Sequence, residues 1–251
     1  LDKSFDSDGK QKFELTNGVD YIHDMQVLDD RKILAVGAIN NRFGIMRFNA
    51  NMTLDATFGT SGRTQASFSE GVHARSFAID SLGRIIAVGG DKIVRFTADG
   101  ALDTTFSDDG WATDDYVVQC HSITIEADGN YLVAGRDNHH FRLSRWSPDG
   151  SRTATYERDV NNYDGDYARS VISKDDGDVF ILGVSGDNYS HRNRRHAVVR
   201  LHRDLVFEAE YTYDFGAGGN ELVHSSLSLP DGKFLLIGYS DSNLAVSRYL
   251  S

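Results

Sequence analysis

The stretch DGDVFILG at positions 176–183 decides the fold, because the chain repeats it four more times in altered form. Each copy is a polar turn followed by four or five large apolar residues and a closing glycine. A short apolar run bounded by turn signals is typical of a strand buried on both faces. The other copies are DRKILAVG at 30–37, LGRIIAVG at 82–89, DGNYLVAG at 128–135 and DGKFLLIG at 231–238.

Each copy has further strand-like segments around it. A strand precedes the turn, as in SITIE at 122–126, and a third follows the glycine, as in HAVVRLH at 196–202. A weaker fourth segment follows, as in GRTQASF at 62–68. Four strands in about 50 residues, with no helical periodicity, are typical of propeller blades. The sequence therefore predicts an all-β fold, a five-bladed β-propeller with four antiparallel strands per blade.

The chain begins inside its own repeating phrase. LDKSFD at 1–6 resembles LDATFG at 54–59 and LDTTFS at 102–107, and the last repeat stops after its third strand. We therefore predict that residues 1–15 form the outer strand of the last blade and close the ring. An open solenoid or two-domain array would leave this half-repeat unpaired. The prediction is one domain, 1–251, with repeats at about 16–68, 69–117, 118–160, 161–213 and 214–251.

These phrases resemble the delta-60 repeat, or DUF5122 β-propeller repeat, of bacterial secreted and surface proteins. The first two copies carry it best, with LDATFGTSGR at 54–63, DRKILAVG at 30–37 and VRFTADGALDTTF at 94–106. The later copies keep the hairpin but lose Leu-Asp at the blade junction. The resemblance implies a bacterial protein that is secreted or on the cell surface, with the periplasm as an alternative. It implies no particular activity.

Composition excludes several classes of function. The net charge of −11 argues against nucleic acid as a partner, since phosphate binding needs a basic face. No apolar run approaches the roughly 20 residues of a membrane helix, so we expect no membrane insertion. The single cysteine, Cys120, excludes a disulfide within the chain, and we predict that it is buried and inert. We expect no metal, no cofactor and a monomer.

The third strand of every repeat contains an arginine. We predict a structural role for this column, in which each guanidinium pairs with backbone carbonyls or with an aspartate of the Leu-Asp phrase, namely Asp2, Asp55 or Asp103. The column consists of Arg47, Arg95, Arg145, Arg200 and Arg248.

A second column, in the first strand of each repeat, alternates histidine with arginine. Because the first strand lines the central channel of a propeller, these residues predict a ring of cationic or titratable groups at the channel mouth, by analogy with other propellers. The alternative is that they hydrogen-bond the neighbouring blade. The ring consists of His23, Arg75, His121, Arg169 and His224, which are followed by Asp24, Ser76, Ser122, Ser170 and Ser225.

Two further groups extend this candidate ligand-binding site. Residues two positions earlier in the first strand add polar groups, and a long loop at 183–197 adds basic ones in an otherwise acidic chain. A solvated loop without function is the alternative for the second group. The added candidates are Tyr21, His73, Tyr167, His191, Arg192 and Arg194.

We therefore expect a noncatalytic recognition module that binds an anionic ligand, an acidic glycan, at the channel mouth. One alternative is a polysaccharide lyase, in which an arginine neutralises a uronate carboxylate while histidine and tyrosine move the α-proton. A purely structural repeat domain of a larger surface protein is another. The sequence assigns no catalytic residue.

Overall fold

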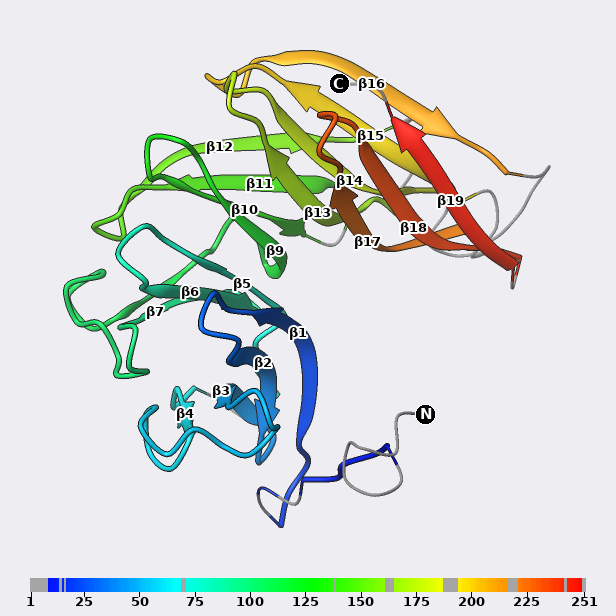
Figure 1. Ribbon diagram of the computed structural model, residues 1–251. Coiled ribbons are helices and arrows are strands. Elements are labelled where there is room, and N and C mark those ends of the chain that lie inside the picture. The colour runs from blue at the N-terminus through cyan, green and yellow to red at the C-terminus, as the bar shows by residue number, and fades with distance from the viewer. Residues whose placement is uncertain are drawn as a thin grey trace.

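The computed structural model is an all-β propeller whose sheets follow one another around a common centre (Figure 1). It describes residues 9–13, 15, 17–68, 71–137, 139–160, 165–186, 194–215, 221–241 and 243–249. In these residues no helix has the length and hydropathy needed to cross a membrane. Every strand pair within a sheet is antiparallel, in chain order.

The strands group into blades as follows. Blade 1 contains β1 (Tyr21–Val27), β2 (Ile33–Ile39), β3 (Arg42–Phe48) and β4 (Arg63–Gln65). Blade 2 contains β5 (Ser76–Ile79), β6 (Ile85–Gly89), β7 (Lys92–Phe96) and β8 (Trp111–Thr113). Blade 3 contains β9 (Gln119–Ile125), β10 (Tyr131–Arg136), β11 (Phe141–Trp146) and β12 (Arg152–Arg158). Blade 4 contains β13 (Tyr167–Ser173), β14 (Val179–Ser185), β15 (Arg195–Leu201) and β16 (Phe207–Tyr213). Blade 5 contains β17 (Glu221–Ser228), β18 (Phe234–Ser240) and β19 (Asn243–Tyr249).

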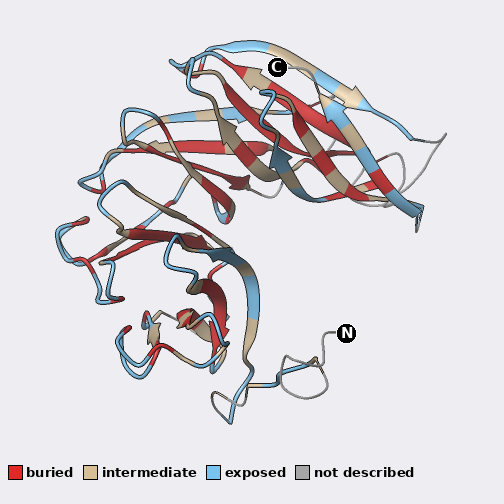
Figure 2. Ribbon diagram, in the orientation of Figure 1, coloured by how far each residue is buried: buried red, intermediate tan, exposed pale blue. Residues whose placement is uncertain are grey.

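The hydrophobic cores lie between blades, because each second strand is apolar on both faces. Leu34 and Val36 of β2 pack with Ile85 and Ala87 of β6, and the same pattern joins blades 2 and 3, 3 and 4, and 4 and 5. Figure 2 shows these second strands largely buried. Burial on two sides explains the continuous apolar runs in the sequence.

The junction between blade 5 and blade 1 differs from the other four. Blade 5 has three strands in the part of the chain that is described, and β19 is its edge. Residues 9–13 and 15 form no strand; Phe13 instead packs on Phe48 of β3, with 5.0 Å between ring centroids. Residues 1–8 and 14 lie outside the described residues. The closing outer strand at 1–15 is therefore not seen where the chain is described, and ring closure stays a prediction.

The third-strand arginines of blades 1 and 2 form the predicted ion pairs and also contact the next blade. Arg47 pairs with Asp55 at 2.7 Å and donates to the carbonyl of Ala98 in the next blade. Arg95 likewise pairs with Asp103 at 2.8 Å and donates to the carbonyl of Pro148.

Where the Leu-Asp phrase is missing, the arginine keeps its role with a different carboxylate. Arg145 pairs with Glu126 and Arg200 with Asp178, both near the turn between first and second strands. The sequence could not reveal this change of partner, because the two groups of acids lie in different loops. Arg248 follows the second pattern with Asp231.

Candidate functional site

A β-bulge lies at the ring position in four of the five first strands. The register shifts at His23, His121, Arg169 and His224, where two residues of the first strand oppose one of the second. A bulge interrupts the alternation of side chains and re-aims them. Two consecutive residues of each of these four strands can therefore face the channel.

The closing glycine of the repeat makes room for this bulge. A Cβ built on Gly183 would lie 1.9 Å from the carbonyl oxygen of Tyr167, two residues before Arg169 in the paired strand. The other four closing glycines meet the equivalent carbonyl at 1.7–2.0 Å. The glycine that marks the repeat in the sequence is thus the residue that lets the first strand bulge.

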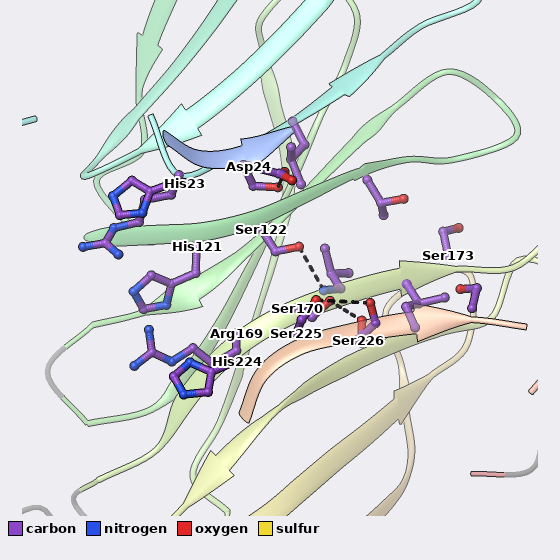
Figure 3. A pocket seen from close by; sticks show the side chains of 17 residues that line it. His23, Asp24, His121, Ser122, Arg169, Ser170, Ser173, His224, Ser225 and Ser226 are labelled. Carbon is purple, nitrogen blue, oxygen red and sulfur yellow. Dashed lines mark hydrogen bonds between the residues drawn. The ribbon is translucent and has the colours of Figure 1, made fainter. Parts of the chain in front are cut away.

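A cavity of about 400 Å³ occupies the centre of the propeller and has lining residues from all five blades. Figure 3 shows imidazole and guanidinium groups gathered at one end and hydroxyl groups further along. The structure brings the whole predicted ring into this one cavity: His23, Arg75, His121, Arg169 and His224.

The hydroxyl layer of the cavity ties neighbouring blades together. Ser76 donates to Asp24 at 3.2 Å, and the hydroxyls of Ser170 and Ser226 lie 2.6 Å apart. Ser122 accepts the backbone N–H of Val171. These contacts match the structural interpretation of the column, but they belong to residues one or two positions after the ring position.

The cationic side chains of the cavity form fewer contacts with the rest of the protein than the hydroxyl groups do. Arg75 and Arg169 form no ion pair with any residue in the described ranges, and the Nε of Arg169 is buried without a hydrogen-bond partner. His121 is the exception, since its Nδ1–H donates to the carbonyl of Ala168 at 2.8 Å. That bond leaves Nε2 as the acceptor of the neutral ring.

The electrostatics of this layer disfavour the protonated forms of His121 and His23. Burial, followed by the guanidinium of Arg169, lowers the pKa of His121 to about 3. Burial also lowers the pKa of His23, with Arg75 and His73 adding to the effect. The pKa of the Arg169 guanidinium is lowered by burial and then by the charge of Arg75. The cavity thus concentrates positive charge, which among its described lining residues only the carboxyl group of Asp24 opposes, and burial raises the pKa of that group.

The remaining predicted residues lie outside the lining of the cavity. The hydroxyl of Tyr21 hydrogen-bonds Nδ1 of His73, which links blades 1 and 2. The Arg194 guanidinium carbon lies 5.4 Å from the ring centroid of Tyr167. His191 and Arg192 lie outside the described residues.

Sequence reasoning missed one basic residue of this region, Arg136. It ends β10 directly after a closing glycine, donates to Gln119 Oε1 at 3.0 Å and stacks on Tyr167 at 4.1 Å. The sequence could have indicated Arg136, because the residue after each closing glycine begins a loop at the channel mouth.

One group of possible metal ligands stands apart from the channel. Atoms of Asp178, His202 and Glu208 lie within 4.8 Å of one another. The guanidinium of Arg200 pairs with the carboxylates of Asp178 and Glu208, so its positive charge already balances the two groups that would bind a metal ion. These residues therefore fit an ion-pair network better than a metal centre.

Comparisons with known proteins agree with the fold. Residues 28–58 and 83–106 match the family described as a domain of unknown function (DUF5122) beta-propeller. No curated protein matches the sequence. A protein of unknown function from Bacteroides caccae is similar with a TM-score of 0.53 and 14% identity, over 86% of this chain and 72% of that one.

Two similar structures come from bacterial surface proteins. One is PorZ, a surface component of the type-IX secretion system of Porphyromonas gingivalis, with a TM-score of 0.54 and 10% identity over 90% of this chain. The other is the extracellular domain of a putative hybrid two-component system from Bacteroides thetaiotaomicron, with a TM-score of 0.52 and 11% identity over 91% of this chain. The chain spans 34% and 29% of those two proteins. Blades 1 and 2 thus match the family model of the DUF5122, or delta-60 repeat, β-propeller, and the same hairpin continues through all five blades.

Proposed function

We propose that this propeller is a noncatalytic recognition module of a secreted or surface protein, and that its channel mouth binds an acidic glycan. The observation that carries the proposal is the cationic layer, in which Arg75 and Arg169 face one cavity without a carboxylate partner among the described residues. Guanidinium groups bind carboxylate and sulfate oxygens through paired hydrogen bonds. The two neighbours from surface proteins support the location.

Binding of an anion should take up protons. An anionic ligand stabilises the protonated form of His23, whose pKa is lowered by burial and by Arg75, whereas the pKa of His121, about 3, is too low for that ring to take up a proton between pH 7 and pH 5. A rise of one unit in one histidine pKa tightens binding about tenfold at a pH below both values. Affinity should therefore increase as the pH falls from about 7 to about 5, and added salt should weaken it by screening.

Calorimetry with oligomers of uronates and sulfated glycans tests the proposal at two pH values and two salt concentrations. Arg75→Glu combined with Arg169→Glu should abolish binding while the melting temperature stays near that of the wild type. The control is Arg31→Glu, because Arg31 lies in the turn after β1, at the other end of the blade from the ring. Binding indifferent to pH, salt and both channel arginines would refute the proposal.

A second candidate is β-elimination on a uronate polymer, and one contact favours it. His73 Nε2–H donates to Asn41 Oδ1 at 3.0 Å, so its Nδ1 accepts the hydroxyl proton of Tyr21. In such a reaction a base takes the α-proton, the C4–O bond breaks, the C4–C5 double bond forms and the leaving oxygen is protonated, while Arg75 neutralises the carboxylate. Incubation with a panel of uronate polymers should then raise the absorbance of unsaturated products. A flat trace over the panel eliminates this candidate.

A further inference from the structure

Three arginines gather at the junction between blades 3 and 4, and two of them lie outside the lining of the central cavity. Three guanidinium carbons surround the phenol ring of Tyr167, with distances to its centroid of 4.1 Å for Arg136, 5.4 Å for Arg194 and 5.7 Å for Arg169. They come from the end of β10, from the residue before β15 and from β13. We call these three arginines and Tyr167 the tyrosine hub.

The hub gathers like charges at one point of an acidic protein. Arg136 and Arg169 form no ion pair with a carboxylate in the described ranges, whereas all five third-strand arginines do. Arg194 is only 7% exposed. Cation–π contact with the ring of Tyr167 offsets part of the repulsion between the guanidinium groups, about 0.5–2 kcal/mol per contact. It does not neutralise the charges of Arg136 and Arg169.

The lowered pKa of Arg169 is consistent with this crowding of positive charges. Burial is the largest cause of its lowering, and the charges of Arg75, Arg136 and Arg194 follow. Arg169 is also the one hub member that lines the central cavity. An anion held at the hub would therefore lie at the cavity edge, between blades 3 and 4, and off the axis of the propeller.

We infer that the tyrosine hub is the subsite for a terminal tetrahedral oxyanion, the sulfate or phosphate ester of a sugar. This inference rests on the proposed function. Such an ester presents three terminal oxygens, one for each guanidinium, and a phosphate monoester carries about −1.5 to −2 charges. A carboxylate has two oxygens and one charge, and a single fork-shaped guanidinium satisfies it. Clusters of arginines are a recurring way to recognise phosphate groups.

Three probes that differ only at C6 test this inference by calorimetry: glucose 6-sulfate, glucose 6-phosphate and glucuronate. The esters should bind at least about tenfold more tightly than glucuronate, a difference of about 1.4 kcal/mol. Arg136→Gln should remove that selectivity, and Arg136→Lys should restore only part of it, because lysine keeps the charge without the fork. Arg75→Gln, which changes the ring outside the hub, should weaken all three probes to a similar extent.

Measurements at two pH values distinguish a phosphate ester from a sulfate ester. Between pH 7.5 and pH 5 the phosphate ester loses charge, since its second pKa is about 6, while the sulfate ester does not. Preference for phosphate at pH 7.5 that disappears at pH 5 indicates a phosphorylated ligand, and preference for sulfate at both indicates a sulfated one.

Failure of the inference differs from failure of the proposed function. Glucuronate binding as tightly as the esters, or ester selectivity that survives Arg136→Gln in a variant that melts like the wild type, would overturn the hub and leave the channel site standing. Uronate oligomers that bind while no ester does would also overturn it. Absence of binding for the probes and for all acidic oligomers would remove both.

Discussion

Ring closure by the N-terminal segment makes a sharp energetic prediction about Arg248. Aligned on the repeat, Asp2 occupies the position of Asp55 and Asp103, which pair with the third-strand arginines of blades 1 and 2. In the structure Arg248 pairs instead with Asp231 at 2.6 Å, and its side chain is 54% exposed. If residues 1–15 close the last blade, Arg248 should interact with Asp2.

The magnitude follows from burial. The side chains of Arg95 and Asp103 are 1% and 9% exposed, and residues coupled in such a network interact by about 0.5–3 kcal/mol. An exposed pair such as Arg248–Asp231 contributes about 0.2–1 kcal/mol. A double-mutant cycle of Asp2→Ala and Arg248→Ala should therefore give a coupling energy of about 1–3 kcal/mol if the ring closes, and close to zero if it does not.

Apolar surface at the same seam adds a second measure. Met25 and Val27 of β1 are 62% and 66% exposed, and Leu244 and Val246 of β19 are 80% and 45% exposed (Figure 2). Fully burying a side chain of this kind contributes about 1.5–3 kcal/mol, so covering half of each of the four gives about 4 kcal/mol in total. Closure of the ring by residues 1–15 should bring blades 5 and 1 together and cover this surface, and removal of the segment should cost several kcal/mol and promote aggregation through the edge of β19.

Urea denaturation measures both effects on the full chain, the single and double variants, and the chain from residue 16 onward. A truncated protein with an unchanged midpoint, together with an Asp2–Arg248 coupling near zero, would refute ring closure by this segment. The cycle of Asp231→Ala with Arg248→Ala is the control for an exposed pair.

Three further predictions test the parts of the fold that build the site. Gly183→Ala should lower the free energy of unfolding by about 1–3 kcal/mol and weaken binding of acidic glycans, because its Cβ would meet the Tyr167 carbonyl at 1.9 Å; an alanine variant with unchanged melting and binding would contradict the role of the bulge. Phe106→Ala should cost about 3–5 kcal/mol in a urea melt, since Phe106 is fully buried beneath Arg95 at the blade 2–3 junction, and a loss below 1 kcal/mol would contradict that packing. Burial raises the pKa of Asp166 to about 7, so the folded state holds a proton there that the unfolded state releases, and the contribution of Asp166 to stability falls as pH rises from about 4 to about 7. Relative to the wild type, Asp166→Asn should gain about 2–4 kcal/mol between pH 4 and pH 8, and parallel stability curves would show that Asp166 is charged throughout.

The repeated hairpin was enough to predict the blades, and column alignment was enough to predict that the ring residues meet. Both inferences use only sequence spacing, and the propeller converts equal spacing into equal distance from the axis. Contacts between blades were harder to foresee. The switch from Asp103 in one blade to Glu126 in the next places an acid from another loop against the same arginine, and no periodic signal marks that exchange.

The candidate site shows where strand periodicity fails for a physical reason. Strict alternation would place His121 and Ser122 on opposite faces of β9, yet both line the cavity because the bulge at His121 rotates the strand. The bulge in turn requires a glycine in the paired strand, and that glycine ends the apolar run of every repeat in the sequence. The closing glycine that marks the repeat therefore also allows two layers of side chains to line the cavity. One layer consists of hydroxyl groups that join the blades, and the other consists of cationic groups at the channel mouth. A recognition site can then vary at His23 or Arg75 from blade to blade without disturbing the serine contacts that hold the ring together.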